Sequence, residues 1–469
     1  MSTFSGLTGA LSALHAQRHG MDVTGQNIAN ANTDGYSRQR VNLEATGGST
    51  VPAIYSISDG ASGGVTVTDV GRIQDTFLET RARIEHGQSA YLAGKQQVYD
   101  RIEQVFKEPS KTGLQSQLSD FWKSWHDLVN QPGDPAARTQ VLAQATTVAS
   151  TIKDSYATLG SLWQTGREQL DGYATDLNSA AERVAQLNQA IVRSGQAGLP
   201  ANELADQRDL LVLHISELTG ASTLARPDGS VDVFISGSPL VNGANYRQVS
   251  VTGAQRMEDQ SVTPVRLVWD KPANTPVAVT SGTIAATMET LGTTLPGYGV
   301  GLDKVAAALA NTVNTQHKLG LDLQGNAGVD FFSSTKAANF GVALTSTNQI
   351  AAAVKPPAGA PPGTGKYDGN NADALAGLAT AADGPDREYR QFIIDLGSAK
   401  QTVDRRAAIQ GAITSDVDSA RISQSGVNLD EEMSNLISYQ RAYQAASRVI
   451  TTVDDMLDTL INRTGLVGR

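Results

Sequence analysis

Residues 429–460, near the C-terminal end of the chain, read LDEEMSNLISYQRAYQAASRVITTVDDMLDTL. Apolar side chains recur there at alternating spacings of three and four residues, the a/d pattern of a helix that packs in a coiled coil. One row of this seam consists of Leu429, Leu436, Tyr443, Ile450 and Leu457, and the other of Tyr439, Ala446, Val453 and Leu460. The stretch therefore predicts a long helix whose apolar edge needs a partner.

The first thirty residues carry a matching pattern. A helix is expected over about residues 5–28, with an apolar row that Arg18 and Gly25 interrupt. This row consists of Phe4, Leu7, Leu11, Leu14, Met21 and Ile28. Two seams at opposite ends of one chain predict that the ends meet in a helical stem, which carries everything between them.

A run of turn-forming residues follows the first helix, Asn27-Ile-Ala-Asn-Ala-Asn-Thr-Asp-Gly-Tyr36. Physical chemistry alone favours a plain helix stop here, because Asn, Asp and Gly tolerate left-handed turns. The run also resembles the N-terminal signature of bacterial flagellar axial proteins, through Asn27, Asn30, Asn32, Gly35 and Tyr36. The closing stretch Ser425-Gly-Val-Asn-Leu-Asp-Glu-Glu-Met433 resembles more specifically the hook-associated protein 1 (FlgK) family.

The resemblance implies a structural part of the bacterial flagellum that polymerises through its terminal helices at the junction between hook and filament. The partners that it implies are further copies of the chain, the hook protein, the second hook–filament junction protein and an export chaperone on the C-terminal helix. It also implies an extracellular location, reached by type III export without a cleaved signal peptide. The start of the chain agrees, because residues 1–9 lack a basic segment followed by an apolar run.

Composition excludes several classes of protein. The chain has 469 residues, no cysteine and a formal net charge of −10. Disulfide frameworks and thiolate metal sites are therefore excluded, and an acidic chain without a basic stripe is a poor binder of nucleic acid. No apolar run is long enough to cross a bilayer, so no membrane partner is expected either.

The predicted fold is mainly α with a β-rich insert, an α+β multidomain chain. Residues 1–40 and 425–469 form the terminal coiled-coil stem, and 41–219 with 283–424 form a discontinuous domain of long helices. At Gly220 the apolar period changes from 3.6 to 2, and turn residues punctuate the sequence, so 220–282 is predicted to be a small outer β domain. Part of 320–370 is a candidate addition to it. Two local predictions are a helix break at Pro296-Gly-Tyr-Gly299 and a strand over 340–344.

Several motifs resemble sites of chemistry but lack a residue that the chemistry requires. Gly363-Thr-Gly-Lys366 lacks the first glycine and the hydroxyl residue of a phosphate-binding loop, and 322–333 lacks the central glycine and final glutamate of a calcium loop. His15 and His19 have helical ligand spacing without an acidic neighbour, and their place beside the seam favours a packing or hydrogen-bonding role. The acidic run 430–432 is expected to flank the seam, and Asp206–Asp209 to be a solvated polar face. We therefore expect no catalytic, cofactor or metal site, and no enzyme.

Two alternatives to the junction protein stay open. One is a coiled-coil adaptor whose ends pair within the chain and never polymerise. The other is a different flagellar axial protein, of the hook or rod type. A cell-wall hydrolase would need a catalytic carboxylate in a cleft, and the sequence offers none that can be identified.

Overall fold

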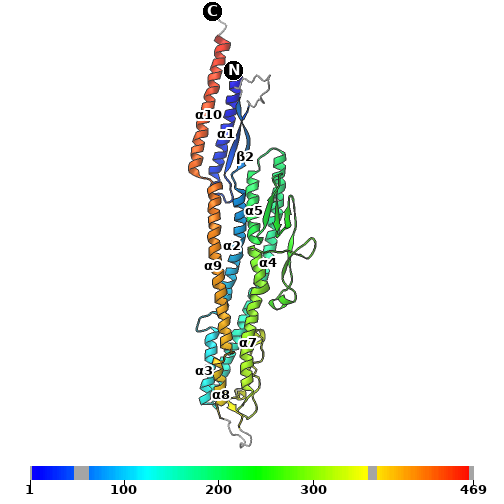
Figure 1. Cartoon of the computed structure of the whole chain (residues 1–469), viewed down its shortest axis with the longest axis vertical. Coiled ribbons are helices and arrows are strands. Elements are labelled where there is room, and N and C mark those ends of the chain that lie inside the picture. Colours follow the sequence, from blue (N-terminus) through cyan, green and yellow to red (C-terminus); the bar gives the residue numbers. More distant parts are fainter. Residues whose placement is uncertain (1–2, 47–62, 357–366, 464–469) are drawn as a thin grey trace, which may run out of the picture.

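The structure is a computed structural model, which describes residues 3–46, 63–356 and 367–463. The molecule is elongated, with both termini at one end (Figure 1). Helices that run along the long axis account for most of it, and small sheets lie to one side. The predicted class, mainly α with a β-rich insert, is confirmed.

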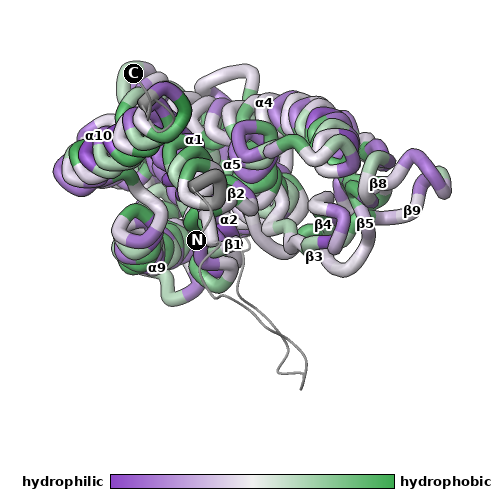
Figure 2. Tube along the Cα trace, turned by 90° about the horizontal axis from the view of Figure 1, so that it is seen from above, coloured by the Kyte–Doolittle hydropathy of each residue, from purple (hydrophilic) through white to green (hydrophobic). Residues whose placement is uncertain are grey.

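The two ends of the chain form the predicted stem. Helix α1 (Thr3–Ala29) lies alongside α10 (Leu429–Asp458), which continues into a π-helical turn, Thr459–Arg463. An antiparallel hairpin of β1 (Gln39–Thr46) and β2 (Gly64–Arg72), with a bulge between Asn42 and Leu43, packs against α1. Seen along the axis, the stem and the outer sheets lie on opposite sides of the body (Figure 2).

The body consists of long helices, which begin at the capping and proline residues that the sequence provides. Asp75 and Asp134 cap α2 and α4 by accepting hydrogen bonds from backbone N–H groups of the first turn, and Pro135 occupies the first position of α4. The helices are α2 (Thr76–Phe106), α3 (Leu114–Asn130), α4 (Pro135–Gln196), α5 (Asn202–Thr219), α8 (Asn370–Gly377) and α9 (Pro385–Ser425). Helix α4, with 62 residues, is about 90 Å long. Its apolar residues face one continuous core.

The helix break predicted at Pro296 is wrong. Helix α6 (Gly282–Glu289) passes through a π-helical turn, Thr290–Thr294, directly into α7 (Leu295–His317). The N–H of Leu295 bonds the carbonyl of Thr290, five residues back, so the helix widens just before the proline. The π-helical turn thus changes the hydrogen-bond register just before Pro296, which has no N–H to donate.

The β-rich insert consists of two small antiparallel sheets on the flank of α4. One contains β3 (Ser222–Ala225), β4 (Val231–Ile235), β5 (Ser238–Asn242) and β6 (Asn245–Tyr246), and the other β7 (Val249–Thr252), β8 (Arg266–Trp269) and β9 (Thr275–Pro276). Asn178 and Asn188 of α4 hydrogen-bond the backbones of Val249 and Val231. These side chains hydrogen-bond β7 and the start of β4, and so join the insert to the long helix.

The distal end of the body has an aromatic core and irregular loops. Phe121, Trp125, Phe331 and Phe332 are fully buried against one another. A two-residue ladder pairs β10 (Gly320–Leu321) with β11 (Ala353–Val354). The strand predicted over 340–344 is wrong, because only an isolated bridge joins Val342 to Phe332.

Candidate functional site

The contact between α1 and α10 is centred on small residues of α1. Ala16 is 1% exposed, and a methyl group on Gly20 would lie only 2.6 Å from the Tyr439 ring. The apolar row predicted for α1 lies beside this contact and not in it. Its residues Met21 and Ile28 each directly follow a residue of the contact. The two helix axes therefore approach closely, and the larger side chains lie at the edge of the contact.

Most of the predicted seam is half-buried. The half-buried residues are Leu7, Leu14, Met21, Ile28, Leu436, Tyr439, Tyr443, Ile450, Val453 and Leu457. Leu11, Leu429 and Leu460 are 47%, 50% and 53% exposed, and Ala446 is buried. The side chain of Phe4 lies outside the described residues. One α1–α10 pair thus leaves much of its apolar surface in contact with water.

Asn27 marks the point where the stem meets the body, and it is 1% exposed. Its Nδ2 donates to the Gln39 carbonyl at 2.9 Å and to Oε2 of Glu432 at 3.0 Å. Its Oδ1 accepts from the Tyr36 hydroxyl at 2.8 Å and from the Gln39 N–H at 3.0 Å. All four hydrogen-bonding positions of the amide are filled. The asparagine of the family motif is therefore the centre of a polar junction.

Glu432, the partner of Asn27 from the other end of the chain, is 2% exposed. Its Oε1 lies 2.7 Å from the Arg38 guanidinium, which also pairs with Glu431 at 2.8 Å. The expectation that this acidic run flanks the seam is wrong for Glu432, which occupies the buried d position three residues after Leu429. Its burial could have been predicted from the sequence, because a charged residue there occupies a heptad position that faces the partner helix.

The chain crosses between stem and body twice at this level. Helix α9 ends at Ser425, and Asn428 caps α10 by accepting from the N–H groups of Asp430 and Glu431. The backbone N–H of Arg38 donates to the Ser425 carbonyl at 2.9 Å. The Arg38 carbonyl accepts from the N–H of Ile73, directly after β2, at 2.8 Å, so Arg38 bonds both crossings, β2 to α2 and α9 to α10. We call the set Asn27, Tyr36–Gln39 and Ser425–Glu432 the joint.

The other motif residues shape the turn beside the joint. Asn30 donates to the Gln26 carbonyl and accepts from the Thr33 hydroxyl, while Asn32 is exposed. Gly35 adopts a φ of 76°, in the left-handed region that suits glycine. Burial, with the negative charges of Asp206, Glu203 and Glu432, raises the pKa of Tyr36 to about 12. Its hydroxyl therefore keeps its proton and can donate to Asn27.

Helix α5 is bound to the joint through Asp206–Asp209. Arg72, at the end of β2, places Nη1 2.9 Å from Asp206 and 2.8 Å from Asp209, and Asp206 also accepts from the Ser37 N–H. Burial opposes ionisation of Asp209, but Arg208 and Arg72 together hold its pKa below the usual value. The expectation of a solvated polar face is wrong here, since Asp206 and Arg208 are buried.

A histidine cluster links four helices below the joint. His86 of α2 lies 3.0 Å from Glu217 of α5 and 3.0 Å from Asp418 of α9. His214 lies 2.8 Å from Asp176 of α4 and 3.8 Å from Glu217. Glu217 and Asp176 raise the pKa of His214 to about 9, Glu217 and Asp418 raise that of His86, and the two histidines lower the pKa of Glu217 to about 2.

We expect the free energy of unfolding to fall as the pH rises from 6.5 to 9. A raised folded-state pKa gives stability that is complete below the unfolded value of 6.5 and is lost as the pH passes the folded value. The His214 side chain is 41% exposed, so water screens its ion pairs and the loss should be about 1 kcal/mol or less. Urea unfolding at a series of pH values measures it. A His86→Gln/His214→Gln variant should lack this slope, and an equal slope in both proteins would contradict the assignment.

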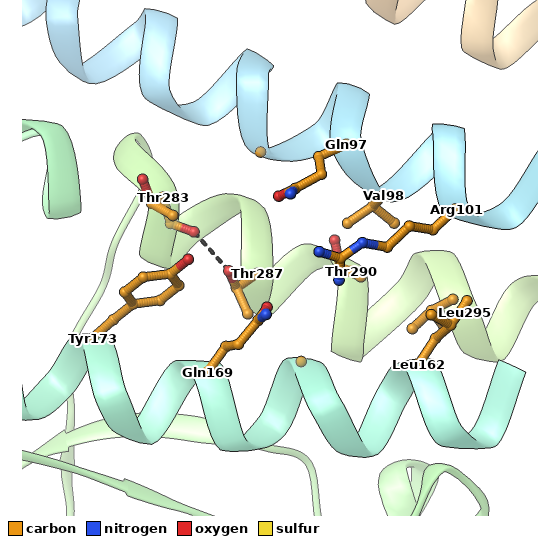
Figure 3. A pocket seen from close by; sticks show the side chains of 12 residues that line it. Gln97, Val98, Arg101, Leu162, Gln169, Tyr173, Thr283, Thr287, Thr290 and Leu295 are labelled. Atoms are coloured by element: carbon orange, nitrogen blue, oxygen red, sulfur yellow. Dashed lines mark hydrogen bonds between the residues drawn. The ribbon is translucent and has the colours of Figure 1, made fainter.

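A partly open cavity of about 40 Å³ lies between α2, α4 and the α6–α7 helix. Arg101 and Gln97 extend toward it from α2, and Gln169 and Tyr173 from α4 (Figure 3). The Thr287 hydroxyl on its wall donates to the Thr283 carbonyl. The volume suits a few water molecules, and its lining offers no nucleophile beside a base. We assign it no chemistry.

Among the described residues, the motifs that resemble ion sites lack free ligands: their side chains either hydrogen-bond the chain itself or have no further ligand beside them. Asp322 uses its carboxylate to accept from the N–H groups of Gln324 and Asn326 and from the Asn326 side chain. His15 and His19 are exposed on α1, so they do not pack into the seam of a single stem. Residues 363–366 lie outside the described residues. Within the described ranges, no group of three or more His, Asp or Glu could hold a metal ion, and no helix there is long and apolar enough to cross a bilayer.

Comparison with known proteins gives consistent matches along the chain. A family model described as "Flagellar hook-associated protein FlgK helical domain" matches residues 99–332. Models for "Flagella basal body rod protein" and "Flagellar basal body rod FlgEFG protein C-terminal" match residues 7–36 and 418–463. The first segment contains Asn27 and Tyr36 of the joint, and the second contains Ser425–Glu432.

Relatives over the full length agree with the family models. The chain is 31% identical to flagellar hook-associated protein 1 of Bacillus subtilis, with 100% of both chains covered. It is 25% identical to the protein of the same name from Escherichia coli, with 97% of this chain and 99% of the relative covered. The solved structure of the flagellar hook junction protein FlgK from Burkholderia pseudomallei shares the fold, with a TM-score of 0.65 at 17% identity over 74% of this chain and 100% of that one. The chain therefore belongs to the flagellar hook-associated protein 1 (FlgK) family of structural flagellar components.

Proposed function

We propose that this chain polymerises through its terminal helices at the junction between hook and filament. The observation that supports this proposal is the half-covered stem. Large apolar side chains of α1 and α10 stay exposed by 45% or more: Leu11, Leu429, Met433, Ile437, Val449, Met456, Leu460 and Ile461. Such a surface on a monomer marks a protein interaction site. Neighbouring copies in an axial polymer would cover it.

The finer parts of the proposal follow from membership of the family. The role is structural and not catalytic, and the protein acts outside the cell after export without a cleaved signal peptide. Its partners are further copies of itself, the hook protein, the second junction protein and an export chaperone on the C-terminal helix. Residues 1–40 and 425–469 form the polymerising stem, 41–219 and 283–424 the helical domain, and 220–282 the outer β domain.

Leu457→Asp tests the proposal. Leu457 is a half-buried residue on the a row of α10, and it lies outside the contiguous core of the body. An aspartate there should cost the polymer several kcal/mol per interface, because the contact would bury an unpaired charge. The melting temperature of the free protein should barely change. Binding to isolated hooks, measured by cosedimentation, should fall at least about tenfold, and cells should release filament protein into the medium.

Asp458→Ala is the matched control, since Asp458 is the next residue along α10 and is exposed. It should bind hooks as the unchanged protein does. Equal binding by the two variants would argue against assembly through this seam. The non-polymerising adaptor would then be the better description.

A further inference from the structure

A row of charged side chains lies across four helices below the joint, and acidic groups alternate in it with basic ones. Neighbouring groups in the row are 2.8–3.8 Å apart. In order, the row consists of Asp176 of α4, His214 and Glu217 of α5, His86 of α2, Asp418 and Arg421 of α9, and Glu79 of α2. It joins the pair α4–α5 to the pair α2–α9 through two histidines, whose charge can change near neutral pH.

Both ring nitrogens of His86 face carboxylates, and this determines its charge. Nδ1 lies 3.0 Å from Oε1 of Glu217, and Nε2 lies 3.0 Å from Oδ2 of Asp418. An ionised carboxylate only accepts hydrogen bonds, whereas a neutral imidazole has one donor and one acceptor nitrogen. Both bonds can form only when each nitrogen carries a proton, so the bonded ring is an imidazolium. His214 also lies between two carboxylates, those of Asp176 and Glu217.

The ion pairs of Glu217 depend on the two histidines alone. Among the described residues, its carboxylate pairs with His86 and His214 and with no lysine or arginine. Asp418 differs, because Arg421 lies 3.3 Å from it and stays charged at alkaline pH. A neutral His86 can donate to only one of its two carboxylates. When both rings are neutral, no positive charge is left beside Glu217.

Glu217 lies near the end of α5, where the chain leaves for the β-rich insert. Helix α5 ends at Thr219, and β3 begins at Ser222. This end packs closely on α2, since a methyl group on Gly87 would lie 2.9 Å from the Ser216 carbonyl. The first half of α5 is held instead by the pairs of Arg72 with Asp206 and Asp209, which do not depend on a histidine.

We propose that His86 and His214 form a pH-sensitive switch that holds the C-terminal end of α5, and with it the base of the β-rich insert, against α2 and α9. While both rings are protonated, this end is held. After they lose their protons it opens more often, while the first half of α5 stays bound to Arg72. The pKa of His214, which Glu217 and Asp176 raise to about 9, places the opening at alkaline pH. The switch operates within one chain, so the free protein tests it whether or not it polymerises.

Nitrogen-15 spectra of the full-length protein, labelled at its histidines, test the charge state of the two rings. A histidine with the ordinary pKa of about 6.5 is roughly 90% neutral at about pH 7.5. We expect His86 and His214, assigned from single glutamine variants, to show imidazolium shifts on both ring nitrogens at that pH. A neutral ring at either position would overturn the switch.

Amide hydrogen exchange locates the opening. In His86→Gln/His214→Gln both rings are replaced by neutral side chains, so exchange at residues 215–219 should be about threefold to fivefold faster than in the unchanged protein at about pH 7.5. Exchange at residues 203–209 should stay the same, because Arg72 still holds them. His126→Gln is the matched control, since His126 is exposed on α3, and it should change neither segment.

A permanent charge provides the converse test. In the unchanged protein, exchange at residues 215–219, corrected for the intrinsic effect of pH, should rise by the same factor between about pH 7.5 and about pH 10. His86→Arg keeps a positive charge beside Glu217 and should remove most of this rise. Equal acceleration of both segments in the glutamine double variant, or an equal rise in His86→Arg and the unchanged protein, would overturn the switch.

Discussion

Replacing Asn27 with aspartate should release the stem from the body. The aspartate keeps the shape of the side chain but loses the two N–H donors to Gln39 and Glu432. It also places a second carboxylate about 3 Å from Glu432, at a site where both residues are almost completely buried. An uncompensated buried charge of this kind costs about 3–5 kcal/mol. Amide hydrogen exchange in α1 and α10 should accelerate by at least about a hundredfold, while that of α4 stays unchanged.

Two further variants identify the cause. Asn32→Asp makes the same chemical change at an exposed position of the same turn and should leave exchange unaltered. Asn27→Asp/Glu432→Gln removes the repulsion and restores a donor, so it should recover much of the protection. If Asn27→Asp leaves the stem protected, or the second change gives no recovery, the joint does not depend on these bonds.

Arg138→Ala should produce the largest loss of stability in the body. Arg138 is 1% exposed, and burial lowers its pKa to about 10. Its guanidinium donates to the carbonyls of Pro132, Thr347 and Ile350 at 2.7, 3.1 and 2.8 Å. It therefore ties the loop before β11 to the start of α4. Truncation removes all three hydrogen bonds from the guanidinium and opens a cavity, which together cost about 3–5 kcal/mol.

Urea unfolding measures this loss, and hydrogen exchange around Ile350 locates it. Arg183→Ala is the control on the same helix, because Arg183 is exposed and, among the described residues, bonds only Gln186. Its effect should stay within about 0.5 kcal/mol. An Arg138→Met variant should recover part of the packing but none of the hydrogen bonds. Equal stabilities of Arg138→Ala and Arg183→Ala would show that the loop is held by other contacts.

The elements with a strong local signal were predictable from the sequence. The seven-residue period at 429–460 and the turn run at Asn30–Gly35 place α10 and the end of α1 to within a few residues. The hairpin between β3 and β4 follows from Pro227-Asp-Gly229, since Gly229 has a φ of 84°. These signals depend on residues that are close together in the chain, so a short stretch of sequence is enough to predict the structure.

The joint depends on contacts that no local pattern records. Asn27 and Glu432 are 405 residues apart in the sequence, and Arg72 and Asp206 are 134 apart. The local sequence does not distinguish a polar residue that is buried and fully hydrogen-bonded from one that is exposed to solvent. The continuity of α6 and α7 was missed for another reason, because one π-helical turn absorbs a proline that otherwise signals a break.

The bond from Arg38 to Ser425 has a mechanical consequence. A stem linked to its body by two separate unbonded peptides would swivel, and twisting it would simply turn those peptides. Here Arg38 hydrogen-bonds both connecting peptides, at Ile73 and Ser425, and its guanidinium pairs with the buried Glu432. A torque applied to the stem therefore strains these bonds and is transmitted to α2, α5 and α9. The joint resists rotation of the stem relative to the body.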